Sequence, residues 1–474
     1  MAGTGKTCIA LTLCQKLRNE PAILLGGTFF CSRIVDAPAR AAVENIIPTL
    51  AVLLARAAPE CGERLVAELK SYSDVAKMTI PVQGENLFVK PLEAWDHRDR
   101  QIVFVIDALD ECRDKDQLVQ LLEAMATFAS RAGPVRFIVT ARPDPRIRVV
   151  RMENIALCSQ IELYALDQKE VAADIRLVLH ETFKKAPNRT FYTDDDLDAL
   201  TERAGGLFIF ASVAAEYICE TNSPDRLNIV KKKAFIDHLA AKRLEKMYEV
   251  VLEEAFGPVR SGPHELDGPC KIISAILASR ESLSVSTLTK LLDVSKDQVQ
   301  GALDRLHAVM FIPKHGEEGA PHFLHTTFVD FVAARAKMQL IQINELSGHI
   351  VLAKACLRLF TKDLHFDMSQ NLSPRDDCWP TKGVKVSRWL YYACQHWVYH
   401  AYGERTLTTG ISDDLINLAL RSTFLFWLEV FSILKRVDLV LKQLNHATAR
   451  TVRGGVGEFD TNPDAAAAQS YRSR

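Results

Sequence analysis

The opening segment, MAGTGKT, constrains the chain most, because it contains the closing half of a G-x-x-x-x-G-K-[ST] phosphate-binding loop. Glycines let backbone N–H groups turn towards an anion, and the helix that follows directs its positive end to the same place. In such a loop the lysine contacts the β- and γ-phosphates, and the threonine hydroxyl binds Mg²⁺. We therefore predict a nucleotide–Mg²⁺ site at Gly3, Thr4, Gly5, Lys6 and Thr7. A plain glycine turn before a helix is the alternative.

The first glycine of this motif would fall immediately before Met1, and so would the strand that feeds the loop. We expect that strand to lie in the middle of a parallel sheet, beside residues 101–106. Its loss predicts unpaired backbone groups on 101–106. The same argument supports a second interpretation, in which the chain is a truncated structural or interaction fragment that binds no nucleotide.

An apolar run over residues 101–106 ends in acidic groups, in the segment QIVFVIDALDEC. This pattern indicates a buried parallel strand with carboxylates at its C-terminal edge, where ligands of open α/β sheets bind. We predict that Asp107 holds Mg²⁺, and that Asp110 and Glu111 polarise an attacking water. A solvated turn is the alternative for the last two.

A third strand is predicted over residues 135–140, which are apolar and β-branched, before prolines end it. Arg142 then stands at the same edge as Asp107, where a guanidinium can bind a γ-phosphate. The competing interpretation is a surface arginine that pairs with Asp144.

Together these motifs resemble the NACHT module of the STAND class of P-loop NTPases. Their particular residues resemble those of a large fungal, NLR-like group whose nucleotide-binding region is similar to the nephrocystin-3 N-terminal domain. The segments that carry the resemblance are AGTGKT, FFCSR, IIPTLA, VIDALDEC, FIVTARPDPRI, RAGGLFIFA, FLHTTFVDF, WLYYACQHW and FLFWLEVFSIL. They occur in this order between residues 1 and about 440. The resemblance implies a signalling switch in which a helical lid and a winged helix close over the nucleotide.

The pattern of strands, helices and linkers predicts an α/β P-loop core, with its first strand missing, followed by helical units. Strands are expected over 23–30, 101–106 and 135–140, with a last strand-like piece over 161–164 and an irregular connection over 74–91. The predicted domains are a NACHT core (1–165), a helical lid (166–257), a winged helix (258–340), a helical domain (341–450) and a disordered tail (451–474).

Helices near 283–292 and 298–306, capped by serines, precede a predicted hairpin, which is the order of a winged helix. The resemblance implies that His325, at the hairpin end, contacts the β-phosphate of ADP; a histidine at the edge of the core is the alternative. DNA readout is disfavoured because the candidate recognition segment is not rich in Lys or Arg. After Gly205-Gly206, Leu207 and Phe208 stand where many members of the family that the chain resembles have a base-contacting proline. An ordinary helix-capping turn is therefore the alternative to a nucleotide contact at these glycines.

The chain has 58 Lys and Arg residues and 59 Asp and Glu residues, so its net charge does not favour binding to nucleic acid or to an anionic membrane. The sequence has no signal-peptide pattern, and several of its eleven cysteines fall in apolar segments. We therefore expect a cytoplasmic protein with reduced cysteines and no zinc site.

The sequence thus favours a nucleotide-dependent switch that binds ATP or ADP with Mg²⁺, GTP being the other candidate nucleotide. It would self-associate or bind protein partners when open, and hydrolysis would be slow. The alternatives are the truncated fragment without nucleotide binding and a winged-helix regulator that binds nucleic acid.

Overall fold

A computed structural model gives the fold. It describes residues 3–32, 38–71, 74–93, 95, 100–112, 114–131, 133–142, 159–163, 166–186, 192–221, 224–232, 239–256, 268–313, 319–337, 343–366, 368, 386–402 and 413–455. The chain forms two compact units built from discontinuous segments. Unit 1 comprises residues 1–262, 280–282 and 303–341, and unit 2 comprises 263–279, 283–302 and 342–474. None of the helices in the described part of the chain combines the length and apolar character needed to cross a bilayer.

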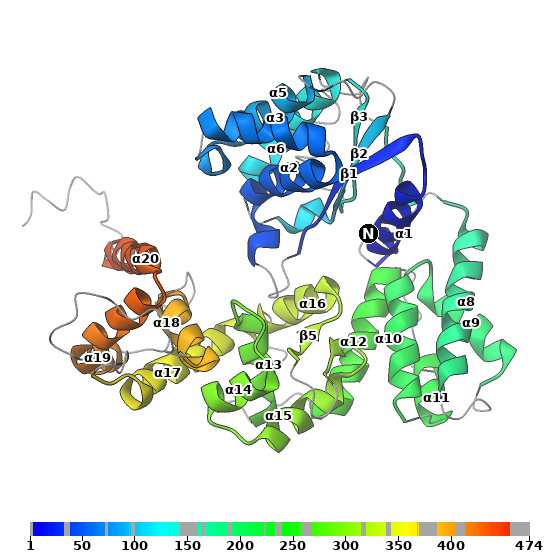
Figure 1. The fold of residues 1–474 in the computed structure, drawn as a ribbon. Coiled ribbons are helices and arrows are strands. Elements are labelled where there is room, and N and C mark those ends of the chain that lie inside the picture. The colour runs from blue at the N-terminus through cyan, green and yellow to red at the C-terminus, as the bar shows by residue number, and fades with distance from the viewer. Residues whose placement is uncertain are drawn as a thin grey trace, which may run out of the picture. The chain divides into compact units, whose positions relative to one another are not determined.

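A three-stranded parallel sheet lies among the helices of the N-terminal part of unit 1 (Figure 1). Its strands are β1 (Ile23–Phe30), β2 (Gln101–Asp107) and β3 (Val135–Val139), in the order β1-β2-β3. Phe30 pairs with Asp107 and Ile106 pairs with Val139, so β2 has a neighbour on each side. The prediction that this strand exposes unpaired backbone groups is therefore wrong, because the neighbours of β2 in the sheet are β1 and β3.

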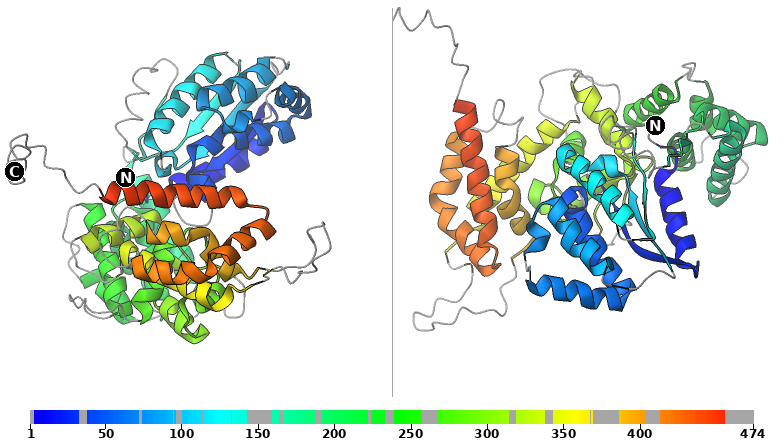
Figure 2. Two further views of the ribbon diagram at one scale, coloured as in Figure 1. Left: turned by 90° about the vertical axis from the view of Figure 1, so that its left-hand side faces the viewer. Right: turned by 90° about the horizontal axis from the view of Figure 1, so that it is seen from above.

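Both faces of the sheet are covered by helices, because alternate residues of β2 point to opposite sides. Ile102, Phe104 and Ile106 pack against α2 (Ile46–Ala57), α3 (Pro59–Ser71) and α6 (Lys115–Arg131). Val103 and Val105 pack against α1 (Lys6–Arg18), on the other face. The right-hand view of Figure 2 shows α1 on the opposite side of the strands from these helices. This arrangement brings the start of α1 to the carboxyl end of β2.

Two connections in the core differ from the predictions. Residues 75–77 and 80–93 form short helical segments of 3-10, α and π type, where the sequence predicted a less regular connection. No strand forms at 161–162, and Ile161 is 78% exposed. Tyr164 lies outside the described residues. The short elements of the core are η1 (Pro38–Ala41), η2 (Val43–Asn45), η3 (Val75–Lys77), α4 (Ile80–Gly84), the π-helical η4 (Glu85–Val89), α5 (Lys90–Glu93) and η5 (Leu109–Glu111).

The rest of unit 1 is helical, with one short hairpin. Gly205, with φ 51°, ends its helix in a left-handed conformation, as a capping glycine does. Met310 pairs with Phe323 in the hairpin, which the sequence predicted. The elements are α8 (Gln168–Lys185), α9 (Asp194–Ala204), α10 (Phe208–Cys219), α11 (Pro224–Lys232), α12 (Ala240–Phe256), η8 (Asp304–Leu306), β4 (Met310–Phe311), β5 (His322–Phe323) and α16 (Thr326–Lys337).

Unit 2 is entirely helical in its described residues. Ser284 caps α14 and the Ser295 hydroxyl accepts from Gln298 N–H at the start of α15, as the sequence predicted. Trp397 and Trp427 are buried and pack edge to face. Its helices are α13 (Gly268–Ala278), α14 (Val285–Leu292), α15 (Lys296–Leu303), α17 (Glu345–Asp363), α18 (Arg388–Ala401), α19 (Asp413–Ile433) and α20 (Val437–Gly455).

The segments predicted as a winged helix and a tail contain the following elements. α14 and all of α15 except Leu303 belong to unit 2, and the β4–β5 hairpin belongs to unit 1. Residues 451–455 are the last residues of α20. Residues 456–474 lie outside the described residues, as does the boundary at residue 258. The predicted domain boundaries all stay predictions.

Candidate functional site

The loop predicted to bind phosphate has a glycine-dependent backbone. Gly3 and Gly5, on either side of Thr4, adopt φ values of 77° and 85°, in the left-handed region that favours glycine. Gly5 is also the N-cap of α1, whose Ile9 N–H donates to Gly5 O at 3.0 Å. A Cβ on Gly3 would lie 2.0 Å from Cγ2 of Ile209. The loop therefore requires glycine at position 3 for both conformation and space.

Residues after the Gly205-Gly206 pair contact this loop. Ile209 N–H donates to Gly3 O at 3.2 Å, and the Phe208 ring lies 3.7 Å from where a Cβ on Gly5 would be. Leu207, which directly follows the glycine pair, is buried. The start of α10 thus covers the loop through Phe208 and Ile209.

Asp107 is held by two hydroxyl groups at the carboxyl end of β2. Its side chain is buried, and Oδ2 accepts from the Thr7 hydroxyl at 2.7 Å. The Thr140 hydroxyl donates to Oδ1 at 2.5 Å and accepts from Ala108 N–H at 2.9 Å. The sequence assigned no role to Thr140, although a threonine at the end of the strand beside β2 was the available signal. The structure joins the loop, β2 and β3 through this one carboxylate.

Asp110 and Glu111 are buried in η5 and do not form a solvated turn. Ala108, at the start of this segment, has φ 53°, a strained value for a residue other than glycine. Asp110 accepts from the backbone N–H of Arg142 at 2.8 Å. Glu111 Oε1 accepts from the Thr326 hydroxyl, the first residue of α16, at 3.0 Å. Both carboxylates therefore face partners far away in the sequence.

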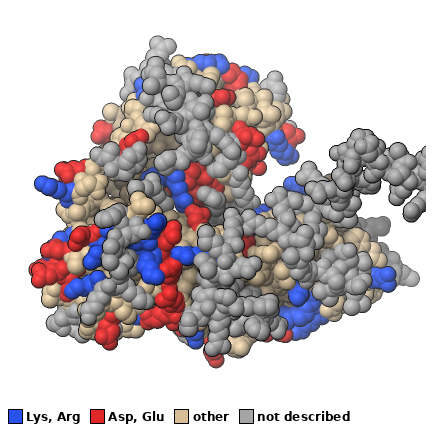
Figure 3. Space-filling model, turned by 180° about the vertical axis from the view of Figure 1, so that it is seen from behind, with Lys and Arg blue, Asp and Glu red and all other residues tan. Residues whose placement is uncertain are grey.

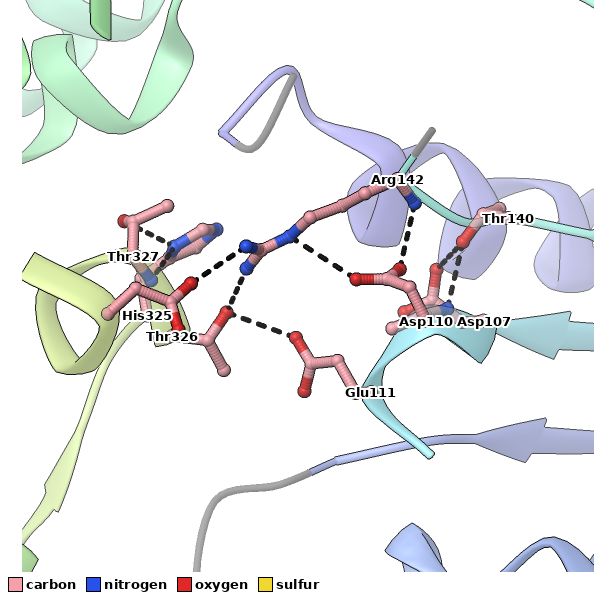
Figure 4. Close-up of polar contacts among 10 residues, drawn as sticks. Asp107, Asp110, Glu111, Thr140, Arg142, His325, Thr326 and Thr327 are labelled. Atoms are coloured by element: carbon pink, nitrogen blue, oxygen red, sulfur yellow. Dashed lines mark hydrogen bonds and ion pairs between the residues drawn. The ribbon is translucent and has the colours of Figure 1, made fainter. Parts of the chain in front are cut away.

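Arg142 links the end of β3 to α16 (Figure 4). Its guanidinium donates to Asp330 Oδ2 at 2.8 Å and to the Thr326 hydroxyl at 2.6 Å, and Nε lies 3.3 Å from Asp110 Oδ2. Burial would lower the pKa of Arg142, but the hydrogen bond and charge of Asp330 raise it, together with Asp110 and Glu111. Asp144, the alternative partner, lies outside the described residues.

His325 lies beside this cluster as a neutral imidazole. Its Nδ1 accepts from Thr327 N–H at 3.1 Å, so the ring proton is on Nε2. Burial, then the charges of Arg142 and Lys6, lower the pKa of His325 to about 4, against the smaller opposite effect of Asp330. The ring can donate a hydrogen bond at neutral pH, but it carries no charge there.

Lys6 is the second cation of the cluster. It is half-buried, and burial lowers its pKa; Arg142 acts in the same direction, while Asp110, Asp107 and Glu111 oppose it. Two cations and three carboxylates thus share one edge of the sheet. This edge can bind an anion through Lys6 and a hard cation through carboxylate and hydroxyl oxygens.

The donor set near Thr7 and Asp107 suits Mg²⁺, because both are oxygen donors and Mg²⁺ sites are completed by phosphate and water oxygens. In the part of the chain that the structure describes, no three His, Cys, Asp or Glu side chains converge as a metal-binding group. The pair therefore fits a cation shared with a bound phosphate better than a cage made by protein alone.

Comparison with known protein families gives a match to the first part of the chain. Residues 1–142 match the family model described as Nephrocystin 3, N-terminal. The matched segment runs from the loop to Arg142, through all three strands of the sheet, and covers less than a third of the chain. No curated protein matches the sequence. The first 142 residues of this chain are therefore similar to the nephrocystin-3 N-terminal family.

Proposed function

We propose that the chain is a nucleotide-dependent signalling switch of the NACHT class of STAND P-loop NTPases, with ATP or ADP and Mg²⁺ as ligands. One observation carries the proposal: four residues chosen from the sequence for this chemistry lie together at the carboxyl end of the sheet. Thr7 is hydrogen-bonded to Asp107, and Arg142 and Glu111 are both hydrogen-bonded to Thr326. The match of residues 1–142 to the nephrocystin-3 N-terminal family supports the same class.

The roles of the residues follow from their positions. N–H groups of the loop and the N-terminal end of α1 would bind phosphate oxygens, with Lys6 adding positive charge. Thr7 and Asp107 would hold Mg²⁺, which neutralises phosphate charge when bound. Asp110 and Glu111 would orient water at the γ-phosphate, and the backbone N–H of Arg142 holds Asp110 in place.

The contacts of α16 support a closed state. Arg142 is bound to Asp330 and Thr326, and Thr326 also binds Glu111, so two groups proposed for γ-phosphate chemistry are both engaged by α16. Slow hydrolysis follows if these contacts must break before Arg142 and Glu111 act. In this closed state His325 would donate its Nε2 proton to a phosphate oxygen as a neutral group.

Two other functions are weaker. Binding of nucleic acid through α15 is disfavoured because this helix has no basic surface. Its only Lys or Arg is Lys296. Figure 3 shows Lys and Arg side chains lying among Asp and Glu side chains on the face it draws. A fragment that binds no nucleotide loses its main physical argument, because β2 is paired on both sides.

The test is equilibrium binding of labelled ATP, ADP and GTP to the purified chain, with and without Mg²⁺. Lys6→Ala should remove most affinity, whereas Asp107→Asn should mainly remove the dependence on Mg²⁺. Lys16→Ala, in the last turn of the same helix α1, is the matched control and should bind like the parent chain. Folded parent protein that binds none of the three nucleotides would falsify the proposal and leave the fragment interpretation.

A further inference from the structure

Two cysteines from distant parts of the sequence meet at the carboxyl edge of the sheet. Cys31 directly follows β1 and Cys112 directly follows η5, and their sulfur atoms lie 3.6 Å apart. Both belong to the same apolar core cluster, with exposed fractions of 5% and 1%. The thiols are therefore in direct contact inside the unit.

The backbone around the pair is already aligned. Cys31 N–H donates to Asp107 O at 2.9 Å, which extends the pairing of β1 with β2 by one residue beyond the Phe30–Asp107 pair. Cys112 N–H donates to Leu109 O, so its position is fixed by the η5 turn. Both chain segments that carry the two sulfurs are therefore held in place by backbone hydrogen bonds.

We propose that Cys31 and Cys112 form a two-electron redox site, closed to a disulfide by a hydroperoxide. One sulfur attacks the distal oxygen of the hydroperoxide and becomes a sulfenic acid, releasing an alcohol, or water when the oxidant is hydrogen peroxide. The second sulfur attacks the sulfenic sulfur, and the sulfenic oxygen leaves as water with the second thiol proton. Two thiols are oxidised and one peroxide O–O bond is reduced, so the electrons balance.

A disulfide between Cys31 and Cys112 would restrain the turn that carries Asp110 and Glu111. Cys112 follows Glu111 directly, so a bond to Cys31 ties the segment that carries Asp110 and Glu111 to the end of β1. The closed loop spans the chain between the two cysteines, and closing a long loop restricts the unfolded chain strongly. Oxidised protein should therefore melt at a higher temperature than reduced protein, and a dithiol reductant should reverse the shift. This inference does not depend on nucleotide binding.

The experiment treats the full chain with hydrogen peroxide, blocks remaining thiols, digests without reduction and maps linked peptides by mass spectrometry. Parent protein should yield a linked peptide containing Cys31 and Cys112 that disappears after reduction. Cys31→Ala and Cys112→Ala should each abolish it and the melting shift. Cys61→Ala is the matched control, because Cys61 is 2% exposed in the same core cluster and should leave the link intact.

Peptide mapping of the parent protein tests the proposal even if a cysteine variant folds poorly. Oxidation of both cysteines to sulfinic or sulfonic acid without a link would overturn it. So would a link in which either cysteine is joined to another partner, or thiols that stay unreacted while exposed Cys8 oxidises. A nucleotide-binding failure with the link present would count against the proposed function alone.

Discussion

The hydroxyl of Thr326 donates to Oε1 of Glu111 at 3.0 Å across 215 positions of sequence. The hydroxyl oxygen of Thr326 also accepts from the Arg142 guanidinium at 2.6 Å. A hydroxyl has one donor and two acceptor positions, so it can serve both partners at once. Thr326 begins α16 and is itself buried, which places its hydroxyl between the acidic turn after β2 and the end of β3. The helix and the sheet edge are thus joined at a single side chain.

Thr326→Val should therefore loosen α16 from the sheet edge. The substitution keeps the shape but removes the donor to Glu111 and the acceptor for Arg142, at a cost of about 1–3 kcal/mol. Thr326→Ser keeps the hydroxyl and is the control. Thermal unfolding of both variants measures the cost. Equal melting temperatures for the valine and serine variants would show that the hydroxyl does not hold the helix.

Arg142 and Asp330 should be coupled energetically. Their ion pair at 2.8 Å joins side chains that are 24% and 45% exposed, so solvent screening limits the coupling to roughly 1 kcal/mol or less. A double-mutant cycle with Arg142→Gln and Asp330→Asn isolates this energy. If the pair keeps the switch closed, Asp330→Asn alone should raise nucleotide hydrolysis and self-association. Arg131→Gln, which breaks an exposed ion pair with Glu85, is the control and should change neither.

Much of the sheet edge could be predicted from the sequence because its signals are local. The predicted strands over 23–30 and 135–140 agree with β1 and β3 nearly to the residue, and the acidic residues after β2 marked its carboxyl end. Thr326 and Asp330 could not be predicted as partners of Arg142, because contacts across 184 and 188 positions depend on the tertiary fold. A threonine at a strand end is also a common β-former, which hid the role of Thr140.

The incorrect predictions have physical reasons as well. The connection over 74–91 contains Gly84 and prolines, which favour irregular structure in a sequence. In the fold Gly84 is helical and packs against Phe128, where an added Cβ would lie 1.7 Å from the ring. The glycine serves close packing rather than a turn. The strand order was also misjudged, because hydrophobic pattern identifies a strand without naming its neighbours in the sheet.

His325 should make stability depend on pH. Its folded pKa of about 4 lies below the ordinary value of 6.5, so the unfolded chain binds more protons between these values. Stability from this residue is complete above pH 6.5 and is lost as the pH falls towards 4, by roughly 2 kcal/mol at pH 5. The parent protein should therefore lose more melting temperature from pH 7.5 to pH 5 than His325→Gln does. His307→Gln, an exposed histidine, is the control. If the melting temperatures of the parent protein and of His325→Gln fell equally from pH 7.5 to pH 5, His325 would not be a buried neutral imidazole.

Thr7 and Thr140 both donate to Asp107, but we expect their substitutions to have different effects. Thr140 is braced by Ala108 N–H, so Thr140→Val leaves a buried carboxylate with one donor fewer and a backbone N–H without this acceptor. It should cost about 1–3 kcal/mol of stability. Thr7 is exposed at the start of α1, so Thr7→Val should cost less than about 1 kcal/mol. Under the proposed function, however, Thr7→Val should remove the Mg²⁺-dependent part of nucleotide affinity, because only Thr7 belongs to the phosphate loop.

The two serine variants separate these effects. Thr7→Ser and Thr140→Ser keep their hydroxyls and should resemble the parent protein in both measurements. Melting temperature, together with ADP binding in Mg²⁺ and in a chelator, gives the comparison. If Thr7→Val and Thr140→Val reduced stability and Mg²⁺-dependent affinity to the same extent, Asp107 would be a structural carboxylate held by two equivalent hydroxyls. The assignment of Thr7 and Asp107 as the Mg²⁺ site would then be wrong.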